Sequence, residues 1–220
     1  MDFYESQYDA LARMHSKYGS ANMGLMSSFT WNNDPKRLLF MLSRYKFVSK
    51  MFEGLHKVLE VGCGDGFASR LVAQAVQELH ATDIDKKLLE NAKEINQNSP
   101  YRIQFIWNDF FKTSLKCQYE GIYLLDVLEH IDKSQEDLFI ENIKKCLLPN
   151  GQVIIGMPSL ESQLYASKES KEGHINCKTS SELKKKLCYF FKNVNILSMN
   201  DEVLHTGFAP MSHYLLALCN

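Results

Sequence analysis

Short apolar runs alternate with amphipathic stretches from residue 58 to the end of the chain. The apolar runs indicate buried strands, and the stretches with apolar residues at helical spacing indicate helices. The pattern predicts strands at 58–61, 78–83, 102–107, 121–125, 152–156, 194–199 and 214–219, and helices at 68–77, 85–96, 134–147 and 181–188. Because this alternation is typical of a parallel sheet, we expect an α/β fold. Its sheet should have seven strands, mostly parallel, with helices on both faces.

The first 55 residues precede the first predicted strand and are expected to be helical. Two amphipathic helices are predicted, at 4–18 and 35–52, with Asp34 as N-cap and Pro35 in the first turn of the second. The stretch 19–26, rich in small residues and methionine, is expected to be a loop. We expect residues 1–55 to form an N-terminal cap that belongs to the same domain as residues 56–220.

The first predicted strand runs into three alternating glycines, Gly62, Gly64 and Gly66, and Glu60 precedes them. Glycine lets the backbone approach a ligand closely, and α/β folds bind nucleotide-like ligands where such a strand meets a helix. The spacing is not the G-x-G-x-x-G of dinucleotide sites, because Phe67 stands where the third glycine would be. No Gly-Lys-Ser/Thr follows, which excludes a P-loop. The turn therefore predicts an adenosine-containing cofactor.

Two motifs together resemble one known family. The pattern E-x-G-x-G-x-G resembles the first motif of class I S-adenosylmethionine (SAM) dependent methyltransferases. Val127-Leu128-Glu129-His130-Ile131 resembles a signature of small-molecule members, including the ubiquinone-biosynthesis O-methyltransferases. The resemblance covers about residues 55–200, and it implies a Rossmann-like fold and methyl transfer from SAM. The chain departs from the family at Glu120, where aspartate is frequent. Its overall pattern is also similar to methyltransferases of bacterial surface-polysaccharide pathways.

Acids at the ends of later strands are expected to contact the cofactor. Asp83 ends the second strand, where a carboxylate can accept both ribose hydroxyl hydrogens; Asp85 is the alternative, or it caps the next helix. The resemblance implies that Asp109 accepts a hydrogen bond from the adenine amine and that Phe110 packs on the ring, unless the two form only a turn. The predicted cofactor contacts are Glu60, Gly62, Cys63, Gly64, Gly66, Asp83, Ile84, Asp109, Phe110 and Asp126.

A group of ionisable residues follows the fourth strand. Asp126, Glu129 and His130 are spaced i, i+3 and i+4, so a helical turn would place them on one face. In one interpretation His130 is a general base and Glu129 the second catalytic residue. In another, a divalent metal such as Mg²⁺ or Mn²⁺ is held by Asp126, Glu129, His130 and His174. That set resembles an E-x-x-E-H grouping of methyltransferases that act on vicinal diols, with Asp126 in place of glutamate. In the third, Glu129 and His130 only order a loop.

Composition narrows the function classes. The net charge is −1 and the only basic run is Lys184-Lys185-Lys186, which gives no drive toward nucleic acid or anionic membranes. Six scattered cysteines without a C-x-x-C pair suggest neither a zinc knuckle nor a disulfide framework, and they suit a reducing cytoplasm. The polar N-terminus and the lack of an apolar run of ~18 residues predict neither a signal peptide nor a membrane span.

The sequence therefore predicts a cytoplasmic SAM-dependent O-methyltransferase that acts on a small polar acceptor. In the cap, Trp31, Arg37, Arg44 and Tyr45 suit a carbohydrate or a phosphorylated group, and His205 in a predicted loop at 200–213 is a further candidate. A saccharide or a polysaccharide precursor is the favoured acceptor. N-methylation, methylation of RNA 3′ ends, and a regulatory SAM-binding protein without catalysis are the alternatives. The sequence gives no oligomeric state.

Overall fold

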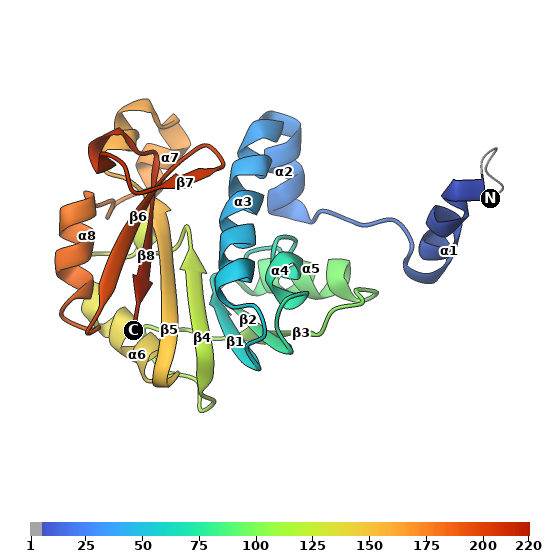
Figure 1. Ribbon diagram of the computed structural model, residues 1–220, viewed down its shortest axis with the longest axis horizontal. Coiled ribbons are helices and arrows are strands. Elements are labelled where there is room, and N and C mark those ends of the chain that lie inside the picture. The colour runs from blue at the N-terminus through green and yellow to red at the C-terminus, as the bar shows by residue number, and fades with distance from the viewer. Residues whose placement is uncertain (1–5) are drawn as a thin grey trace.

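An eight-stranded sheet forms the centre of the computed structural model, which describes residues 6–220 (Figure 1). The strand order is β3-β2-β1-β4-β5-β8-β6-β7. The first five strands pair in parallel, and β8 lies antiparallel between β5 and β6. The strands are β1 (Lys57–Val61), β2 (Glu78–Asp83), β3 (Ile103–Trp107), β4 (Tyr119–Leu125), β5 (Leu147–Pro158), β6 (Val194–Asn200), β7 (Val203–His205) and β8 (Tyr214–Cys219). The predicted α/β fold with a mostly parallel sheet is confirmed.

Helices cover both faces of this sheet. The described α-helices are α1 (Asp9–Tyr18), α2 (Leu25–Asn33), α3 (Pro35–Met51), α4 (Ser69–Ala73), α5 (Lys86–Asn96), α6 (Glu136–Lys144), α7 (Lys168–Gly173) and α8 (Ser180–Leu187). Of these, α3 and α4 lie on one face, and α6 and α8 lie on the other. Short 3-10 turns are η1 (Ser6–Tyr8), η2 (Leu128–His130), η3 (Glu161–Tyr165) and η4 (Ala209–Met211). Within residues 6–220, no helix combines the length and the apolar character that crossing a membrane requires.

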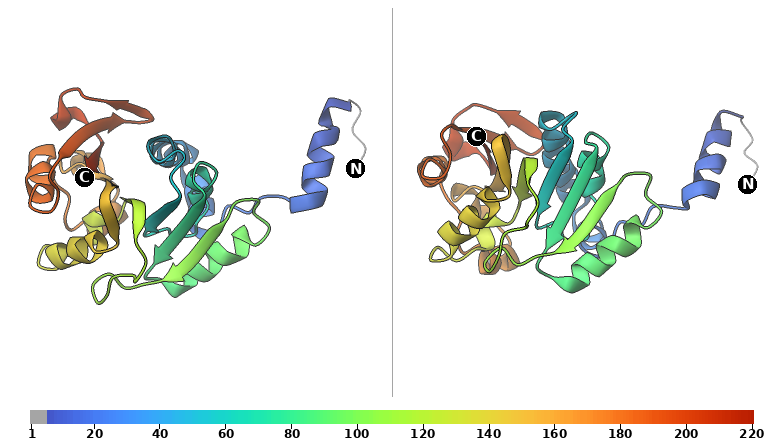
Figure 2. Two further views of the ribbon diagram at one scale, coloured as in Figure 1. Left: turned by 60° about the horizontal axis from the view of Figure 1, so that its bottom comes forward. Right: turned by 90° about the horizontal axis from the view of Figure 1, so that it is seen from below.

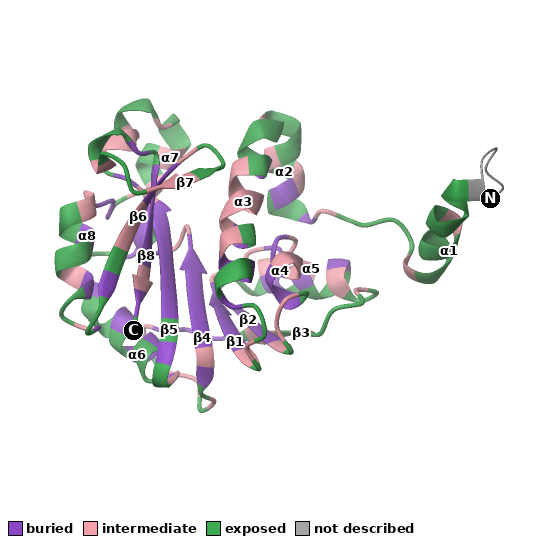
Figure 3. Cartoon of the chain, viewed as in Figure 1, coloured by how far each residue is buried: buried purple, intermediate pink, exposed green. Residues whose placement is uncertain are grey.

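Alternate residues of the central strands pack into two apolar layers, one on each face of the sheet. Ile122 and Leu124 pack on the side of α6 and α8, whereas Tyr123 and Leu125 pack on the side of α3 and α4. This is the two-residue period of a strand whose two faces are both covered. Figure 3 shows the consequence, since most of β4 and residues 153–157 of β5 are buried. A sheet covered on both sides explains why these strands could be predicted as apolar runs.

The sheet has eight strands, whereas the sequence predicted seven. The additional strand, β7, comes from the predicted loop 200–213 and pairs antiparallel with β6. Asn200 and Val203 face each other across a two-residue turn, in which Asp201 has a positive φ of 51°. Aspartate tolerates this left-handed conformation better than most residues, so the turn can close. The segment is polar and short, which left no strand pattern to detect.

Two predicted helices are shorter in the structure. The helix predicted at 68–77 is the five-residue α4, and the one predicted at 134–147 is α6, which ends at Lys144. The next strand, β5, begins at Leu147 and continues through the predicted turn at 149–151. Asn150 adopts a positive φ of 67° there, and the pairing with β4 is irregular at this end. The turn residues therefore distort the strand without ending it.

The cap contains three α-helices instead of two. α3 confirms the predicted second helix, and the Asp34 carboxylate accepts a hydrogen bond from the Lys36 amide at 3.2 Å. α2 begins at Leu25, inside the predicted loop 19–26. α1 lies in the stretch predicted at 4–18, of which residues 4 and 5 are outside the described residues. It buries no residue and stands away from the sheet (Figure 2).

Candidate active site

The glycine turn lies where the strand order reverses. β1 pairs with β2 on one side and with β4 on the other, and open α/β sheets bind ligands at this switch point. Gly62, Gly64 and Gly66 have φ values of 79°, 55° and 66°, a region that glycine adopts readily. A Cβ atom on Gly66 would lie 2.7 Å from the Phe105 ring. Glycine is therefore required here by both conformation and space.

Asp83 and Asp85 have different positions in the structure. The Asp83 carboxylate accepts hydrogen bonds from the Gly64 and Asp85 amides, both at 2.8 Å, so it lies against the glycine turn. The Asp85 carboxylate instead caps α5 by accepting from the Lys87 amide at 2.8 Å. Ile84 between them is exposed. The ribose contact of Asp83 stays a prediction, and the position of the Asp83 carboxylate beside the glycine turn is compatible with that contact.

Glu60 is buried beneath the turn. The Tyr45 hydroxyl donates a hydrogen bond to Glu60 Oε1 at 2.8 Å, and burial raises the pKa of Glu60 to about 7. Tyr45, a predicted candidate for substrate contact, is thus a buried partner of Glu60. Burial also raises the pKa of the Cys63 thiol. The base of the turn is therefore held by groups that favour their neutral forms.

We expect Glu60→Gln to flatten the pH dependence of stability. The folded-state pKa of Glu60 lies above its ordinary value of 4.5, so the fold prefers the protonated carboxyl. This contribution is complete below the ordinary pKa, declines as the pH rises toward 7 and is lost above it. The pKa difference corresponds to at most about 3 kcal/mol. Urea unfolding of both proteins at about pH 5 and about pH 8 measures it. Parallel pH dependence of the two proteins would contradict this role of Glu60.

The two predicted adenine contacts after β3, Asp109 and Phe110, have different surroundings in the structure. Phe110 is 3% exposed and packs edge-on against Phe139 of α6, which leaves little of its ring for an adenine. The Asp109 carboxylate accepts a hydrogen bond from the Phe111 amide at 3.0 Å and pairs with Lys112 at 2.9 Å. Its predicted bond to the adenine amine would have to compete with these partners.

Trp107 is an exposed aromatic residue that the sequence analysis overlooked. It ends β3, pairs in register with Asp83, and is 47% exposed. Its indole N–H donates to the Ile84 carbonyl at 3.0 Å, which fixes the ring beside the predicted ribose site. An aromatic residue at the carboxyl end of a strand next to a switch point was the signal that could have identified it.

Asp126 is not on one helical face with Glu129 and His130. It has a positive φ of 57° and precedes the 3-10 turn η2, so the single helical turn that the spacing suggested does not form. Its carboxylate instead pairs with Arg44 of α3, whose Nη1 lies 2.9 and 2.8 Å from the two oxygens. The Arg44 guanidinium also lies 3.7 Å from the centre of the Tyr214 ring. Asp126 therefore fixes the cap to the end of β4.

Glu129, His130 and His174 do come together, with one ligand atom of each within 4.8 Å of the others. His130 Nδ1 lies 2.9 Å from the Gly173 carbonyl, and His174 Nδ1 lies 2.9 Å from Gln163 Oε1. Because a carbonyl oxygen can only accept, Nδ1 carries the hydrogen in both rings. Each neutral ring then keeps a lone pair on Nε2. We refer to these three residues as the Glu129 cluster.

The Glu129 carboxyl is the buried member of this cluster. Within the described part of the chain, neither of its oxygens has a hydrogen-bond partner. Burial, reinforced by the charge of Asp126, raises the pKa of Glu129 well above its ordinary value. Burial and neighbouring His130 lower the pKa of His174. A buried carboxyl without a partner is unfavourable unless it is protonated or meets a cation.

A cleft of about 500 Å³ adjoins the two histidines. Its walls come from α2, from the start of α3 and from the first turn of α7; its lining residues are Phe29, Asn33, Arg37, His130, Ser167, Glu169, Ser170 and His174. Arg37 lines this cleft and its contact with an acceptor stays a prediction, whereas Trp31 is not part of the lining. His205 is bound within its own hairpin, 2.7 Å from Asn200 Oδ1 and 3.0 Å from the Gly207 amide.

α2 is attached to the glycine turn through Asp65. The Asp65 carboxylate accepts hydrogen bonds from the Ser27 amide at 2.7 Å and from the Ser27 hydroxyl at 3.2 Å. Ser27 is in the first turn of α2, where an amide has no partner within the helix. The Met26 sulfur would lie 2.8 Å from a Cβ on Gly64, so α2 also packs on the turn. The predicted cofactor turn therefore positions one wall of the cleft.

The strand order, the glycine turn at the switch point and the acid at the end of β2 define a Rossmann-like domain of the class I methyltransferase type. Residues 58–151 match the methyltransferase domain family. The solved structure of the N-methyltransferase NodS from Bradyrhizobium japonicum in complex with S-adenosyl-L-homocysteine superposes with a TM-score of 0.67 at 18% identity and covers 98% of both chains. This likeness supports the fold.

Curated relatives agree with that assignment. The chain is 26% identical over 136 residues to the mitochondrial ubiquinone biosynthesis O-methyltransferase of Schizosaccharomyces pombe, which covers 57% of this chain and 48% of that protein. It is 26% identical over 149 residues to the ubiquinone biosynthesis O-methyltransferase of Rickettsia canadensis, covering 61% of this chain and 60% of that protein. The chain thus spans about half to three fifths of their length. Together these similarities support a class I SAM-dependent methyltransferase domain in this chain.

Proposed function

We propose that the enzyme transfers the SAM methyl group to a hydroxyl oxygen of a small polar acceptor bound in the cleft. One observation carries the proposal: both histidines of the Glu129 cluster line the cleft with Nδ1 bound to a carbonyl oxygen. That arrangement leaves a proton-accepting Nε2 on each ring. The O-methyltransferase activity in the names of the curated relatives supports oxygen as the methylated atom.

The chemistry requires placement and removal of one proton. The acceptor oxygen attacks the methyl carbon in line with the carbon–sulfur bond, whose electron pair returns to sulfur and yields neutral S-adenosylhomocysteine. The hydroxyl proton must leave the oxygen, and His130 Nε2 receives it as general base. The Gly173 carbonyl holds the ring in the tautomer that this step needs. His130 then releases the proton to solvent.

A divalent metal is a second candidate for the same cluster, and the unpartnered Glu129 carboxyl favours it. One carboxylate and two imidazoles form a mixed oxygen and nitrogen set that suits Mn²⁺, Fe²⁺ or Zn²⁺ better than Mg²⁺, which prefers oxygen ligands. Histidines that bind metals commonly donate the second ring N–H to a carbonyl, as both do here. A bound metal would lower the pKa of the acceptor hydroxyl. Asp126 is excluded from this set by its pairing with Arg44.

The polar lining favours a saccharide or a phosphorylated acceptor. Arg37 can pair with an anionic group, and Asn33, Ser167 and Ser170 offer hydrogen bonds to hydroxyl groups. A precursor of a bacterial surface polysaccharide has both kinds of group. All six cysteines are free thiols, which is in keeping with the predicted cytoplasmic location.

Calorimetry and product analysis test the proposed function. SAM should bind to the folded protein, and a panel of saccharides and sugar phosphates should contain an acceptor that releases S-adenosylhomocysteine. Methylation at oxygen, identified by mass spectrometry and NMR, is the expected product; methylation at nitrogen would overturn the proposal. If His130 acts without metal, turnover survives treatment with EDTA in a metal-free assay. If turnover stops after EDTA and returns with Mn²⁺ or Mg²⁺, the metal candidate replaces it.

A further inference from the structure

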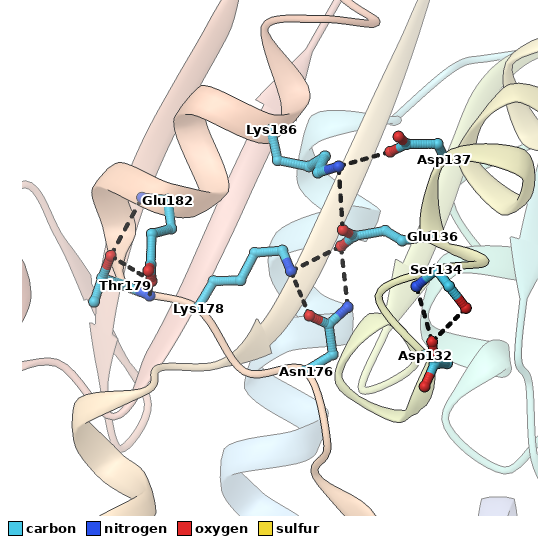
Figure 4. Close-up of polar contacts among 9 residues, drawn as sticks. All are labelled: Asp132, Ser134, Glu136, Asp137, Asn176, Lys178, Thr179, Glu182 and Lys186. Carbon is cyan, nitrogen blue, oxygen red and sulfur yellow. Dashed lines mark hydrogen bonds and ion pairs between the residues drawn. The ribbon is translucent and has the colours of Figure 1, made fainter.

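Buried polar side chains form a network around Glu136 (Figure 4). It consists of Glu136 of α6 with Asn176 and Lys178 from the segment that follows α7, and these residues are 2%, 1% and 7% exposed. Lys178 Nζ lies 2.9 Å from Glu136 Oε1 and donates to Asn176 Oδ1 at 2.6 Å. Asn176 Nδ2 donates to Glu136 Oε1 at 3.2 Å. We call these three residues the Glu136 network.

Backbone contacts connect the network to the site. The Asn176 amide donates to the Glu129 carbonyl at 2.9 Å, and three residues earlier the Gly173 carbonyl accepts from the His130 ring. His174 lies between these two contacts. The Asn176 side chain is held by the network and its backbone holds η2. The position of Asn176 therefore sets the separation between η2, which carries Glu129 and His130, and the segment that carries His174.

Stability alone gives little reason for such a network. Burying two charges and an amide opposes folding, and apolar residues of similar size are frequently as stabilising as a buried ion pair. The network instead fixes the positions of its side chains, because charge-assisted hydrogen bonds hold the atoms that they join in a defined geometry. Lys186 adds a second, longer ion pair to Glu136 Oε2 at 3.6 Å. None of the three network residues lines the cleft.

We propose that Glu136, Asn176 and Lys178 are positioning residues that hold Glu129, His130 and His174 in their working geometry. The inference rests on the proposed function, since it takes the Glu129 cluster as the place where the acceptor is activated. The network touches neither the cleft nor the glycine turn. Its loss should therefore reduce turnover without weakening SAM binding.

Two variants remove the network in different ways. Asn176→Ala deletes both side-chain hydrogen bonds and keeps the backbone amide that contacts Glu129. The double variant Glu136→Met, Lys178→Met replaces the buried ion pair with apolar side chains of similar length, which keeps the test usable if Asn176→Ala does not fold. Thr179→Val is the matched control. It breaks the capping box with Glu182 at the start of α8, next to Lys178, and leaves the network intact.

Circular dichroism first confirms folding, and calorimetry gives the affinity for SAM. We expect kcat to fall about tenfold or more in both network variants, the usual scale for loss of supporting hydrogen bonds around a site. SAM affinity should stay within about twofold, and the ring resonances of His130 and His174 should shift in histidine NMR spectra. Thr179→Val should lose about 1 kcal/mol of stability and keep both kcat and the ring resonances.

Full kcat in a folded network variant, or unmoved ring resonances, would overturn the positioning role. The NMR measurement also separates this inference from the proposed function. If the wild-type protein methylates no acceptor of the panel, the proposed function fails, and the ring resonances alone then decide the positioning role.

Discussion

Replacing His130 with alanine is expected to lower turnover by at least ~100-fold, the usual scale for loss of a general base. The affinity for SAM should be nearly unchanged, because the described side-chain contacts of His130, with the Gly173 carbonyl and the His174 ring, involve neither the glycine turn nor Asp83. Release of S-adenosylhomocysteine at saturating acceptor measures the first quantity, and calorimetry with SAM measures the second. A large loss of kcat with intact cofactor binding would place His130 at the chemical step.

His205→Ala provides the matched control for that experiment. It removes the same ring from β7, where the imidazole contacts only residues of its own hairpin among its described hydrogen-bond partners. We expect turnover to stay within about twofold of the wild-type value, inside the range of ordinary surface substitutions. If His130→Ala were as active as His205→Ala, the His130 ring would serve only to hold Gly173, and the loop interpretation would be correct.

Gly66→Ala is expected to destabilise the fold by about 2–5 kcal/mol and to abolish SAM binding. A side chain at a positive φ costs about 1–2 kcal/mol, and forcing a methyl group into a packed core costs about 1–3 more. The new Cβ would lie 2.7 Å from the Phe105 ring and 3.1 Å from the Ala92 side chain. Urea unfolding measures the free energy of unfolding, and calorimetry on the folded fraction measures binding.

Gly54→Ala separates the two contributions to that loss. Gly54 has a similar φ of 86°, but a Cβ there would meet no atom within 4 Å. The control should therefore show the conformational cost alone, about 1–2 kcal/mol, and leave SAM affinity unchanged. Equal losses in the two variants would mean that Phe105 and Ala92 move aside without cost and that packing does not require glycine at position 66.

The elements predicted well are those whose signal is local. β1, β4 and β5 contain apolar runs because both faces of the sheet are covered there, and α3 starts at an Asp-Pro pair that any helix could use. α2 was missed because its first turn depends on Asp65, 38 residues further along the chain. β7 was missed because it exists only through pairing with β6 across Asp201. Neither dependence leaves a periodic pattern in the sequence.

The candidate site likewise contains some features that the sequence predicts and others that it does not. Motif spacing predicted the glycine turn. The resemblance to methyltransferases that act on vicinal diols grouped Glu129 and His130 with distant His174, and the structure brings one ligand atom of each within 4.8 Å of the others. The predicted group also included Asp126, whose partner Arg44 lies 82 residues earlier in the chain and could not be inferred from spacing. The Glu136 network was not predicted, because Asn176 and Lys178 resemble ordinary surface residues until the fold buries them.

The predicted SAM site and the proposed acceptor cleft both depend on the Asp65 carboxylate. This carboxylate belongs to the glycine turn, yet it anchors the helix that carries Phe29 and Asn33 into the cleft. Any free energy by which bound SAM strengthens the Asp65–Ser27 contact must therefore appear again in the affinity for acceptor. Thermodynamic reciprocity requires the same factor in both directions, so a bound acceptor would raise the affinity for SAM by the factor by which SAM raises the affinity for the acceptor.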